Sequence, residues 1–346
     1  MKNSEFELSK WITGEGAESD IVLSSRIRMA RNIEKIPYPN QADNENLEKV
    51  VTVVRKIINK KENFDLNFID MDELSQIDRN ILVEKHLISP SHASIDHKKA
   101  LLLNEDEDMS IMVNEEDHLR IQILMPGLQL ENAWEKADET DDSFEEELDF
   151  AFSKKWGYLS ACPTNMGTGL RSSVMIHLPA LYITNNIEKM LGAVSKLGLA
   201  VRGIYGEGSE SSGNIYQISN QITLGQSEKD IIENLKSVTV QIVEQERQAR
   251  ERLMKEDKDF IIDKVKRSYG KLKFAHKISN KEALELLSYL RLGINIGIID
   301  NIKASTLSKL IVLIRPSHLQ KYVGKELSSR KRDIKRAELI QKYLNN

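Results

Sequence analysis

Arginine residues in this chain stand beside turns that are rich in glycine or in acidic residues. Arg26 and Arg28 lie two positions apart, so on a β-strand both side chains would point to the same face. Arg120 follows an acidic turn, Arg171 follows a loop with two glycines, and Arg202 begins another glycine-bearing loop. Arginine is always charged, and its planar fork of N–H donors fits phosphate oxygens. The set indicates a phosphate-rich ligand, although any one of these arginines alone would more often pair with a surface carboxylate.

The usual nucleotide-binding motifs are absent from the sequence. It has no Gly-x-x-x-x-Gly-Lys-Ser/Thr loop and neither the His-Arg-Asp nor the Asp-Phe-Gly motif of protein kinases, and Gly167-Thr-Gly169 alone is a weak signal. Negative charge must be stabilised as a γ-phosphoryl group leaves a nucleoside triphosphate. If this chain binds such a nucleotide, arginine side chains must replace the usual phosphate-binding loop.

Acidic residues form a second candidate set. The segment Asn114–His118 places Glu115, Glu116 and Asp117 on a short turn, and Glu207 lies in a glycine-bearing loop. A guanidinium nitrogen is a poor nucleophile, because its lone pair is delocalised and the group holds its proton tightly. Two carboxylates can hold such a group in line with the γ-phosphorus and accept a proton as the N–P bond forms. Acidic residues on a turn are, however, more often simply solvated.

Two further segments allow more than one interpretation. Cys162 precedes a proline at the start of a loop, where it is either a small buried side chain or a reactive thiolate beside arginines. Its motif contains no dedicated base, which disfavours a cysteine protease. In the tail, Arg332 and Arg336 are four residues apart on a predicted helix, with Asp333 adjacent. Such a group binds a ligand that carries both phosphate and guanidinium, or it is an ordinary basic end of a helix.

The hydrophobic pattern indicates an α+β portion followed by a helical portion. Residues 44–60 carry apolar residues at helical spacing, and residues 129–151 predict a very acidic helix with a solvated face. Residues 21–31 predict a short strand that runs into a turn or helix. Further strands are expected at 99–103, 110–113, 120–125, 174–178, 199–202 and 214–219, with helices over 185–197 and 227–255 and an almost wholly helical tail that Gly293 and Gly297 interrupt.

The composition is that of an ordinary globular protein. Of its 346 residues 40% are hydrophobic and 29% are charged, and a formal net charge of -4 disfavours a general nucleic-acid binder. Cys162 is the only cysteine, so no internal disulfide can form. No apolar run approaches the roughly 18–20 residues that cross a bilayer, and the N-terminus lacks the apolar core of a signal peptide. We expect a soluble cytoplasmic protein with no membrane partner and no direct contact with nucleic acid.

Four of the segments named above occur together in an order typical of one enzyme family. They are Ser24–Arg28 (SSRIR), Asn114–Arg120 (NEEDHLR), Cys162–Arg171 (CPTNMGTGLR) and Arg202–Glu207 (RGIYGE). Together they resemble the signature motifs of the phosphagen kinases, the ATP:guanido phosphotransferases. One departure is Met175, since small-molecule relatives commonly carry histidine four residues after the signature arginine.

Two features indicate a subfamily. Phosphagen kinases carry a helical domain before their first arginine motif, whereas here that motif starts at Ser24. That domain contributes to the lid over a small guanidino substrate, so the resemblance favours an acceptor other than a free metabolite. The segment Arg332–Ala337 (RDIKRA) resembles the phosphoarginine-binding motif of bacterial protein arginine kinases.

The resemblance implies a role for each matching residue. Glu116 and Glu207 would hold the acceptor guanidinium, with Glu116 the better candidate for the base, and Cys162 would lie beside that group. ATP would be the donor, with Mg²⁺ held mainly by phosphates and water and no residue implied as a metal ligand. The other implied residues are, for the nucleotide, Ser24, Arg26, Arg28, His86, Arg120, Arg171, Ser172, Ser173, Val174, Met175, Arg202 and Gly203, and, for phosphoarginine, Arg332, Asp333, Arg336 and Ala337.

The implied fold is α+β. A phosphagen-kinase-like catalytic domain, a twisted antiparallel sheet flanked by helices, would span residues 1–254, and a helical domain with the phosphoarginine motif would span 255–346. The implied enzyme is a protein arginine kinase that transfers the γ-phosphoryl group of ATP to arginine side chains. Its mark would direct proteins to a Clp protease in heat-shock and stress regulation. The implied partners are a small zinc-binding activator protein, a Clp ATPase/protease, a heat-shock repressor and a second copy of the chain.

Two other functions remain open on the sequence alone. A kinase of a small guanidino metabolite would use the same motifs and would form an acid-labile phosphagen from free arginine or creatine. A non-catalytic adaptor would instead read phosphoarginine on other proteins. The presence of both Glu116 and Glu207 beside the full arginine set disfavours the adaptor.

Overall fold

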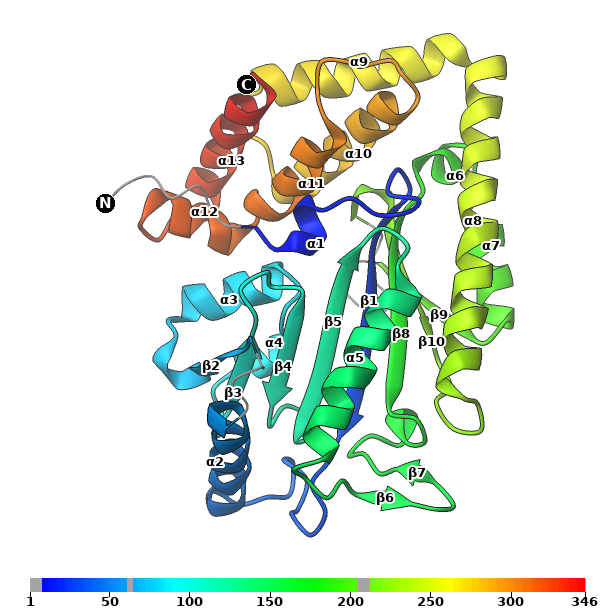
Figure 1. The fold of residues 1–346 in the computed structure, drawn as a ribbon. Helices are drawn as coiled ribbons and strands as arrows, with labels where there is room; N and C mark the ends of the chain where they lie inside the picture. Colours follow the sequence, from blue (N-terminus) through cyan, green and yellow to red (C-terminus); the bar gives the residue numbers. More distant parts are fainter. Residues whose placement is uncertain (1–7, 61–64, 204–211, 346) are drawn as a thin grey trace. The chain divides into compact units, whose positions relative to one another are not determined.

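Strands and helices alternate in the first two thirds of the chain, and helices alone follow (Figure 1). The computed structural model describes residues 8–60, 65–203 and 212–345. The helices are α1 (Lys10–Thr13), α2 (Asn44–Lys60), α3 (Gln76–Glu84), α4 (Pro90–Ala93), α5 (Leu130–Glu145), α6 (Pro179–Ile183), α7 (Ile187–Lys196), α8 (Glu228–Glu256), α9 (Lys258–Phe274), α10 (Asn280–Asn295), α11 (Ala304–Leu313), α12 (Pro316–Val323) and α13 (Ser329–Leu344), and the strands are β1 (Val22–Arg31), β2 (Asn67–Asp70), β3 (Ala100–Leu103), β4 (Met109–Val113), β5 (Leu119–Pro126), β6 (Phe152–Ser153), β7 (Gly157–Tyr158), β8 (Leu170–His177), β9 (Leu199–Gly203) and β10 (Ile215–Asn220).

Eight strands form the main sheet, in the order β2-β3-β4-β5-β1-β8-β10-β9. The strands from β2 to β1 in this order pair antiparallel with their neighbours. Strands β6 and β7 form a separate two-stranded hairpin. The α+β fold is confirmed, with an antiparallel sheet flanked by helices and a helical C-terminal region (Figure 1).

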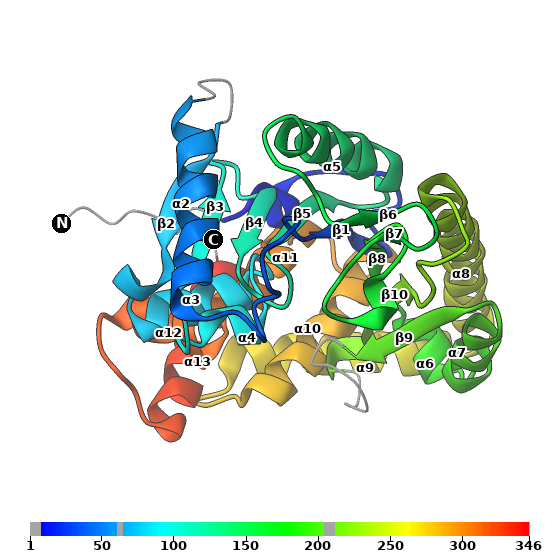
Figure 2. The same cartoon turned by 90° about the horizontal axis from the view of Figure 1, so that it is seen from below.

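One face of the sheet is apolar and covered by helix α5. In the register of β1 and β5, Ile27 lies opposite Ile123 and Met29 opposite Ile121, and opposite residues share a face. All four side chains are buried, as is Phe144 of α5. Figures 1 and 2 show α5 lying across the strands on one side. Each such side chain contributes about 2 kcal/mol of hydrophobic free energy, so this layer anchors the strands that carry the polar residues of the opposite face.

Contacts between Cα positions divide the chain into two units. The expected domain boundary between residues 254 and 255 is a different division, and it stays a prediction. Unit 1 comprises Met1–Gly14, Ser24–Ser173 and Ser219–Lys236, and unit 2 comprises Glu15–Leu23, Val174–Ile218 and Ser237–Asn346.

The helical core of unit 2 lies among α9, α10, α11 and α13. Leu287, Leu307 and Ile340 are fully or almost fully buried in it. Gly293 lies inside α10, so the expected interruption at this residue is wrong. A Cβ atom there would lie 2.3 Å from Cγ1 of Val265 on α9, so glycine permits the two helices to approach closely. Gly297, with a φ of 75°, does lie just beyond the end of α10.

Strand β1 differs from its sequence-based prediction. Residues 21–31 predict a short strand followed by a turn or helix, but the strand continues to Arg31. The reason is the strict alternation of Arg26 and Arg28 with buried Ile27 and Met29, which has the period of a strand with two different faces. Charged residues on one face obscure this period, because a half-buried strand normally carries neutral polar residues there.

Helix α5 is shorter than predicted and less solvated. It ends at Glu145 instead of residue 151. Asp141 is only 3% exposed, because it faces the sheet and pairs with buried Arg31, so the prediction of a wholly solvated acidic face is wrong here. Helix α2 and strands β3, β4, β5, β9 and β10 are confirmed to within about two residues. Strand β2 and helices α3 and α4 were not predicted.

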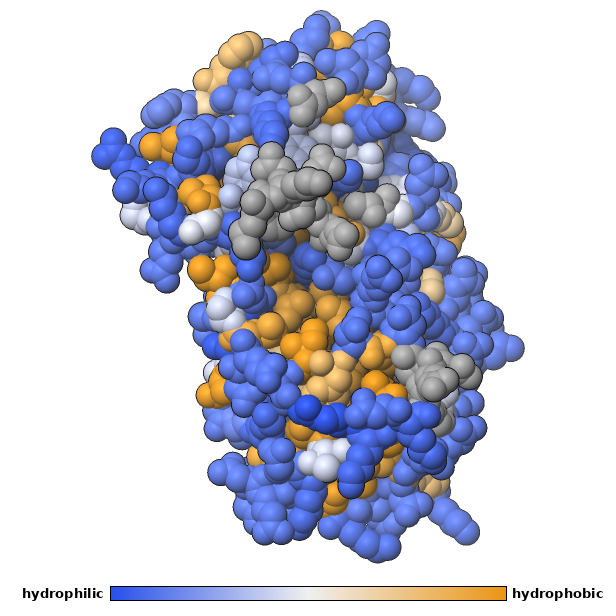
Figure 3. All heavy atoms as spheres, turned by 60° about the vertical axis from the view of Figure 1, so that its left-hand side comes forward, coloured by the Kyte–Doolittle hydropathy of each residue, from blue (hydrophilic) through white to orange (hydrophobic). Residues whose placement is uncertain are grey.

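Figure 3 shows one face, on which hydrophilic residues predominate and apolar residues gather in a limited area. Within the described residues, no helix is both long and apolar enough to cross a membrane.

Candidate functional site

Strands β1, β5 and β8 bring four arginines of unit 1 together. Arg26 and Arg28 point away from the apolar face of β1, and Ala30 lies opposite Arg120 of β5, which places Arg120 on the same side. The charges of Arg120 and of Arg171 on β8 act on both Arg26 and Arg28. The structure therefore assembles these four predicted nucleotide-binding arginines into one cluster.

The arginine cluster is electrostatically strained. Burial, followed by repulsion from Arg120 and Arg171, lowers the pKa of Arg26 to about 10. The pKa of Arg28 lies well below its usual value, mainly because of burial and then because of Arg26 and the same two neighbours. Nε of Arg28 is buried and makes no hydrogen bond. A cluster of like charges with an unused buried donor fits a ligand that carries several negative charges and acceptor oxygens.

The turn between β4 and β5 supplies the carboxylates of this site. Glu115 is the buried one, with a side chain 5% exposed, and Oε2 lies 2.7 Å from a terminal nitrogen of Arg120. Its other oxygen accepts the hydroxyl of Ser89 at 2.6 Å. Burial opposes ionisation of Glu115, but Arg120 and Ser89 outweigh it, so its pKa lies below the ordinary value. Glu115 therefore remains a carboxylate near neutral pH and fixes one side of the Arg120 guanidinium.

Glu116 is the carboxylate that faces solvent. Its side chain is 43% exposed, and Oε2 lies 2.9 Å from the second terminal nitrogen of Arg120. The guanidinium of Arg120 thus spans Glu115 and Glu116, one with each end of its fork. A carboxylate that is half exposed can receive an incoming guanidinium, and the role that the resemblance implies for Glu116 stays a prediction.

Asp117 and His118 of the same turn hold neighbouring chain segments. Oδ1 of Asp117 accepts the side-chain amide of Asn32 and the backbone N–H of Ala161, both at 2.7 Å. Nδ1 of His118 accepts the N–H of Ile33 at 3.0 Å, which leaves Nε2 to donate to the carbonyl of Pro37. Burial keeps the pKa of His118 below its usual value, so it stays neutral. The turn thereby joins the end of β1 to the loop that carries Cys162.

Cys162 lies partly exposed in the loop before β8. Its Sγ atom is 3.0 Å from the hydroxyl of Thr164. Buried Arg31 supports this loop, since it donates to the carbonyl of Thr168 at 3.0 Å and its guanidinium stacks on the ring of Tyr158 at 3.5 Å. The same guanidinium pairs with Asp141 at 2.7 Å. Asp117 anchors the loop through the N–H of Ala161, next to Cys162, and the predicted contact of the thiol with the acceptor stays a prediction.

The remaining nucleotide-site residues of unit 1 occupy different environments. Ser24 is buried, and Ser173 accepts a hydrogen bond from Nε of Arg26 at 3.3 Å. Ser172 is buried, and its backbone N–H donates to Asn220. His86, in a left-handed conformation with φ 60°, packs edge-on against Trp11. Its predicted contact with the nucleotide stays a prediction.

Four of the predicted nucleotide-site residues belong to unit 2. Val174 is buried and Met175 partly exposed on β8. Arg202 and Gly203 end strand β9 and line a pocket of about 770 Å³. Glu207 lies outside the described residues, so its predicted role is neither supported nor contradicted. Among the side chains that the structure describes, no three of the types His, Cys, Asp and Glu are placed to hold a metal ion.

The four residues of the predicted phosphoarginine motif lie on α13 in unit 2. Arg336 is 2% exposed and donates to the backbone carbonyls of Ile314 and Ile278, both at 2.9 Å, and to Asp333 at 2.6 Å. Arg332 is partly exposed and donates to the carbonyl of Leu327 at 2.8 Å. Ala337 is buried in the helical core, 1% exposed. Of the two arginines, Arg336 has the stronger structural role.

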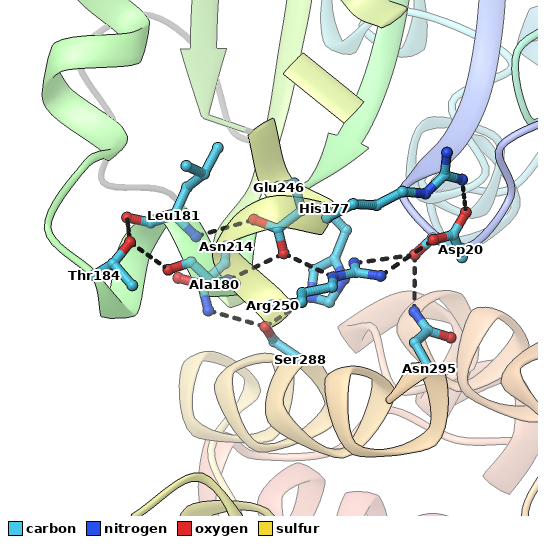
Figure 4. A network of polar contacts seen from close by, with 11 residues as sticks. Asp20, His177, Ala180, Leu181, Thr184, Asn214, Glu246, Arg250, Ser288 and Asn295 are labelled. Carbon is cyan, nitrogen blue, oxygen red and sulfur yellow. Dashed lines mark hydrogen bonds and ion pairs between the residues drawn. The ribbon is translucent and has the colours of Figure 1, made fainter. Parts of the chain in front are cut away.

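A buried polar network in unit 2 had no signal in the sequence (Figure 4). Glu246 on α8 accepts the first N–H groups of α6, from Ala180 and Leu181, and pairs with Arg250 at 3.0 Å. Arg250 also pairs with Asp20, the residue two positions before β1. This network fixes the segment from which β1 starts to helix α8.

Sequence reasoning missed several residues that organise the site. It assigned a role to Glu116 but none to Glu115, whose burial and pairing with Arg120 depend on the turn conformation. It gave no role to Ser89, which is 26 residues away along the chain. For Asp117, the one available signal was its position in the acidic turn, which does not tell a buried acceptor from a solvated acid.

Comparison with known proteins identifies the family. A family sequence model described as "ATP:guanido phosphotransferase, C-terminal catalytic domain" matches residues 46–249, more than half of the chain. The chain belongs to the ATP:guanido phosphotransferases. A second model, "Protein-arginine kinase McsB C-terminal domain", matches residues 258–346 of this phosphotransferase. The family resemblance noted from its motifs is thereby confirmed.

Relatives place the phosphotransferase within its family. The protein-arginine kinase of Halothermothrix orenii is 62% identical over 338 residues, covering 98% of this chain and 97% of the relative. The protein-arginine kinase of Pelotomaculum thermopropionicum is 50% identical over 342 residues, covering 98% and 96%. The chain therefore belongs to the protein-arginine kinase family.

Solved structures share the fold of this phosphotransferase. A lombricine kinase superposes with a TM-score of 0.60 at 23% identity, covering 71% of this chain and 72% of that one. The substrate-free duplicated taurocyamine kinase from Schistosoma mansoni gives a TM-score of 0.59 at 19% identity, covering 93% and 51%. At such identities the likeness shows the fold alone.

Proposed function

We propose that this enzyme transfers the γ-phosphoryl group of ATP to arginine side chains of proteins. The observation that carries the proposal is the cluster of Arg26, Arg28, Arg120 and Arg171, whose mutual repulsion a triphosphate would relieve. The membership of the chain in the protein-arginine kinase family supports arginine in a protein as the acceptor.

ATP would supply an activated phosphoryl group whose transfer to nitrogen releases ADP. Arg28 is suited to bind the phosphate oxygens of ATP, because its buried Nε–H makes no hydrogen bond in this structure and can donate one. Arg26, Arg120 and Arg171 would share the remaining phosphate oxygens, since forked guanidinium groups bind such oxygens in pairs. Mg²⁺ would be held mainly by phosphate and water oxygens. Arg202 and Gly203 would complete the nucleotide site as the resemblance implies.

The exposed carboxylate of the acidic turn would bind the acceptor guanidinium. Glu116 would align the substrate guanidinium and accept the proton that its nitrogen loses as the N–P bond forms. Glu207 would be the second carboxylate of this clamp. Cys162 would contact the guanidinium from the loop that Asp117 anchors. Exclusion of water by the buried cluster would favour transfer to nitrogen over hydrolysis.

Mass spectrometry at non-acidic pH tests the reaction. The enzyme is incubated with Mg-ATP and a generic unfolded protein, and phosphoarginine is sought on both proteins. We expect phosphoarginine with wild-type enzyme, a loss of at least about a hundredfold with Glu116→Gln, and nucleotide binding retained in that variant. Parallel incubations contain free arginine or creatine. Formation of a free phosphagen with unmodified protein would instead show a metabolite kinase, and no transfer with intact binding would show an adaptor.

We further propose the cellular role that the resemblance implies. The mark would direct proteins to a Clp ATPase/protease, a small zinc-binding protein would activate the kinase, a heat-shock repressor would be a target, and the enzyme would act as a homodimer in the cytoplasm. Arg332, Asp333, Arg336 and Ala337 would bind phosphoarginine and regulate activity. Pull-down with the Arg332→Ala variant against wild type, using a phosphoarginine peptide, tests the motif, and equal capture would remove Arg332 from it.

A further inference from the structure

Ser89 connects the start of helix α4 to the acidic turn of the site. Its hydroxyl accepts the backbone N–H of His92 at 3.0 Å and donates to Oε1 of Glu115 at 2.6 Å. The segment after α4 also holds this turn, because Nε2 of His97 lies 2.9 Å from the backbone carbonyl oxygen of Asn114. Two hydrogen bonds from one segment therefore fix the backbone and the first carboxylate of the turn.

Glu115 has three donors on its two oxygens. Oε1 receives the hydroxyl of Ser89, while Oε2 receives a terminal nitrogen of Arg120 at 2.7 Å and the backbone N–H of Glu116 at 3.0 Å. The side chain is 5% exposed, so water cannot easily replace a lost donor. Removing the Ser89 hydroxyl would leave Oε1 buried without its donor and let the carboxylate turn.

The orientation of Glu115 reaches the reacting groups through one guanidinium. The guanidinium group of Arg120 is planar and rigid, and it contacts Glu115 with one terminal nitrogen and Glu116 with the other. A rotation of the Glu115 carboxylate therefore moves the Arg120 plane and its contact with Glu116 together.

We propose that Ser89 is a positioning residue for phosphoryl transfer, whose hydroxyl fixes Glu115 and through it the guanidinium of Arg120 beside Glu116. The proposal rests on the proposed function, because it takes Arg120 and Glu116 as parts of the transfer site. It assigns to Ser89 no contact with substrate or nucleotide.

The chain contains a matched control for the capping role of Ser89. Ser75 precedes α3, accepts the backbone N–H of Asp78 at 3.2 Å and donates to the Asp78 carboxylate at 2.7 Å. Ser75→Ala thus removes the same two kinds of hydrogen bond as Ser89→Ala, at a neighbouring helix start and away from Glu115. A comparison of Ser89→Ala with Ser75→Ala therefore distinguishes the loss of a helix cap from the loss of the hydrogen bond to Glu115.

Steady-state kinetics with protein substrate give the first readout. We expect Ser89→Ala to lower kcat about tenfold, which is about 1.4 kcal/mol, while KM for ATP changes less. Ser89→Thr, which keeps the hydroxyl, restores most of the rate, and Ser75→Ala matches wild type. In a Glu115→Gln background the further loss from Ser89→Ala shrinks to less than about twofold, because the two residues act through one contact.

The pH profile of kcat gives a readout that a purely structural role would not move. The groups that face Glu115 are Arg120, Arg28 and neutral His92, with Asp117 nearby on the turn. Loss of the Ser89 donor raises the pKa of Glu115, since that hydrogen bond favours the ionised form. We therefore expect the acid limb of the Ser89→Ala profile to lie at higher pH than that of wild type.

Two results would overturn the proposal. One is a kcat for Ser89→Ala equal to that of Ser75→Ala, and the other is a full additional loss in the Glu115→Gln background. Nitrogen NMR of the Arg120 guanidinium, assigned with Arg120→Lys, tests the positioning without any transfer. A held guanidinium gives a sharp signal that broadens in Ser89→Ala but not in Ser75→Ala. If wild-type enzyme phosphorylates no arginine while this NMR difference persists, the proposed function fails and the positioning stands; an unchanged signal refutes the positioning alone.

Discussion

Removing one arginine of the cluster should stabilise the nucleotide-free protein while it destroys nucleotide binding. Arg26 is the residue to change, because it lies within the cluster on β1 and its pKa is strongly lowered there. Burial and the charges of Arg120 and Arg171 bring its pKa from 12.5 to about 10. Methionine replaces the unbranched aliphatic part of the side chain and removes its charge, so Arg26→Met relieves both the repulsion and the cost of burying charge.

The size of the effect follows from that pKa. The fall in the pKa of Arg26 from 12.5 to about 10 corresponds to roughly 3 kcal/mol of unfavourable interaction for the charged form. Part of the Arg26 side chain reaches solvent, and the change also removes its 3.3 Å hydrogen bond to Ser173. We therefore expect Arg26→Met to raise the free energy of unfolding by about 1–2 kcal/mol and the melting temperature by roughly 2–5 °C.

Thermal unfolding with and without Mg-ATP measures both halves of the prediction. At a nucleotide concentration of a hundred times Kd, wild-type protein gains about 2.7 kcal/mol from binding, and Arg26→Met should gain less than about 0.5 kcal/mol at the same concentration. Arg252→Met is the control, because Arg252 is exposed on α8 and pairs only with Glu256 among the described residues. A lower melting temperature for nucleotide-free Arg26→Met, or an undiminished shift with Mg-ATP, would refute the reasoning.

Three further predictions test other parts of the structure. Arg336→Met should lower the free energy of unfolding, measured in urea, by about 3 kcal/mol, because two buried carbonyls lose their donor. Arg332→Met should lower it by less than about 1 kcal/mol. Equal losses for the two variants would contradict the structural roles assigned to these arginines. Asp117→Ala should speed alkylation of the Cys162 thiol several-fold by freeing its loop, and an unchanged rate would contradict that anchoring role. Burial lowers the pKa of His92 from 6.5 to about 3, so the unfolded chain takes up its proton first as pH falls, and stability is lost below pH 6.5. His92→Gln should therefore flatten the decline in unfolding free energy between pH 6.5 and 5 by about 2 kcal/mol, and an unchanged slope would assign it to other groups.

The sequence predicts the helices and strands best where one face is wholly apolar. Helix α2 follows its apolar spacing over the predicted residues. Strand β1 was assigned too short because arginines occupy the face that usually carries neutral residues. The burial of Asp141 depended on Arg31, 110 residues away, and no local pattern reports such a partner. The missed elements β2, α3 and α4 are short, so few periodic positions mark them.

The candidate site was predicted in kind but not in arrangement. Residue types and the motif order identified the arginines and Glu116. The sequence does not reveal the different roles of the three acids in the turn, because they are adjacent and chemically similar. Only the directions of their side chains distinguish them. Asn114 has a φ of 58°, and from this bend Glu115 turns inward, Glu116 remains exposed and Asp117 becomes buried. The conformation of the whole turn therefore decides which acid meets which partner.

The acidic turn and the arginine cluster impose opposite demands on the fold. The cluster needs cations held close together, which costs free energy until a polyanion arrives. Glu115 lowers that cost at Arg120, with which it pairs, and also at Arg28, and its carboxylate sets the direction of the Arg120 guanidinium. Were every arginine neutralised in this way, the apo protein would be more stable and the attraction for phosphate would be lost. One buried carboxylate at Arg120 keeps both properties, which explains why the neighbouring Glu116 is exposed: a second buried acid would compete with the nucleotide for the same charge.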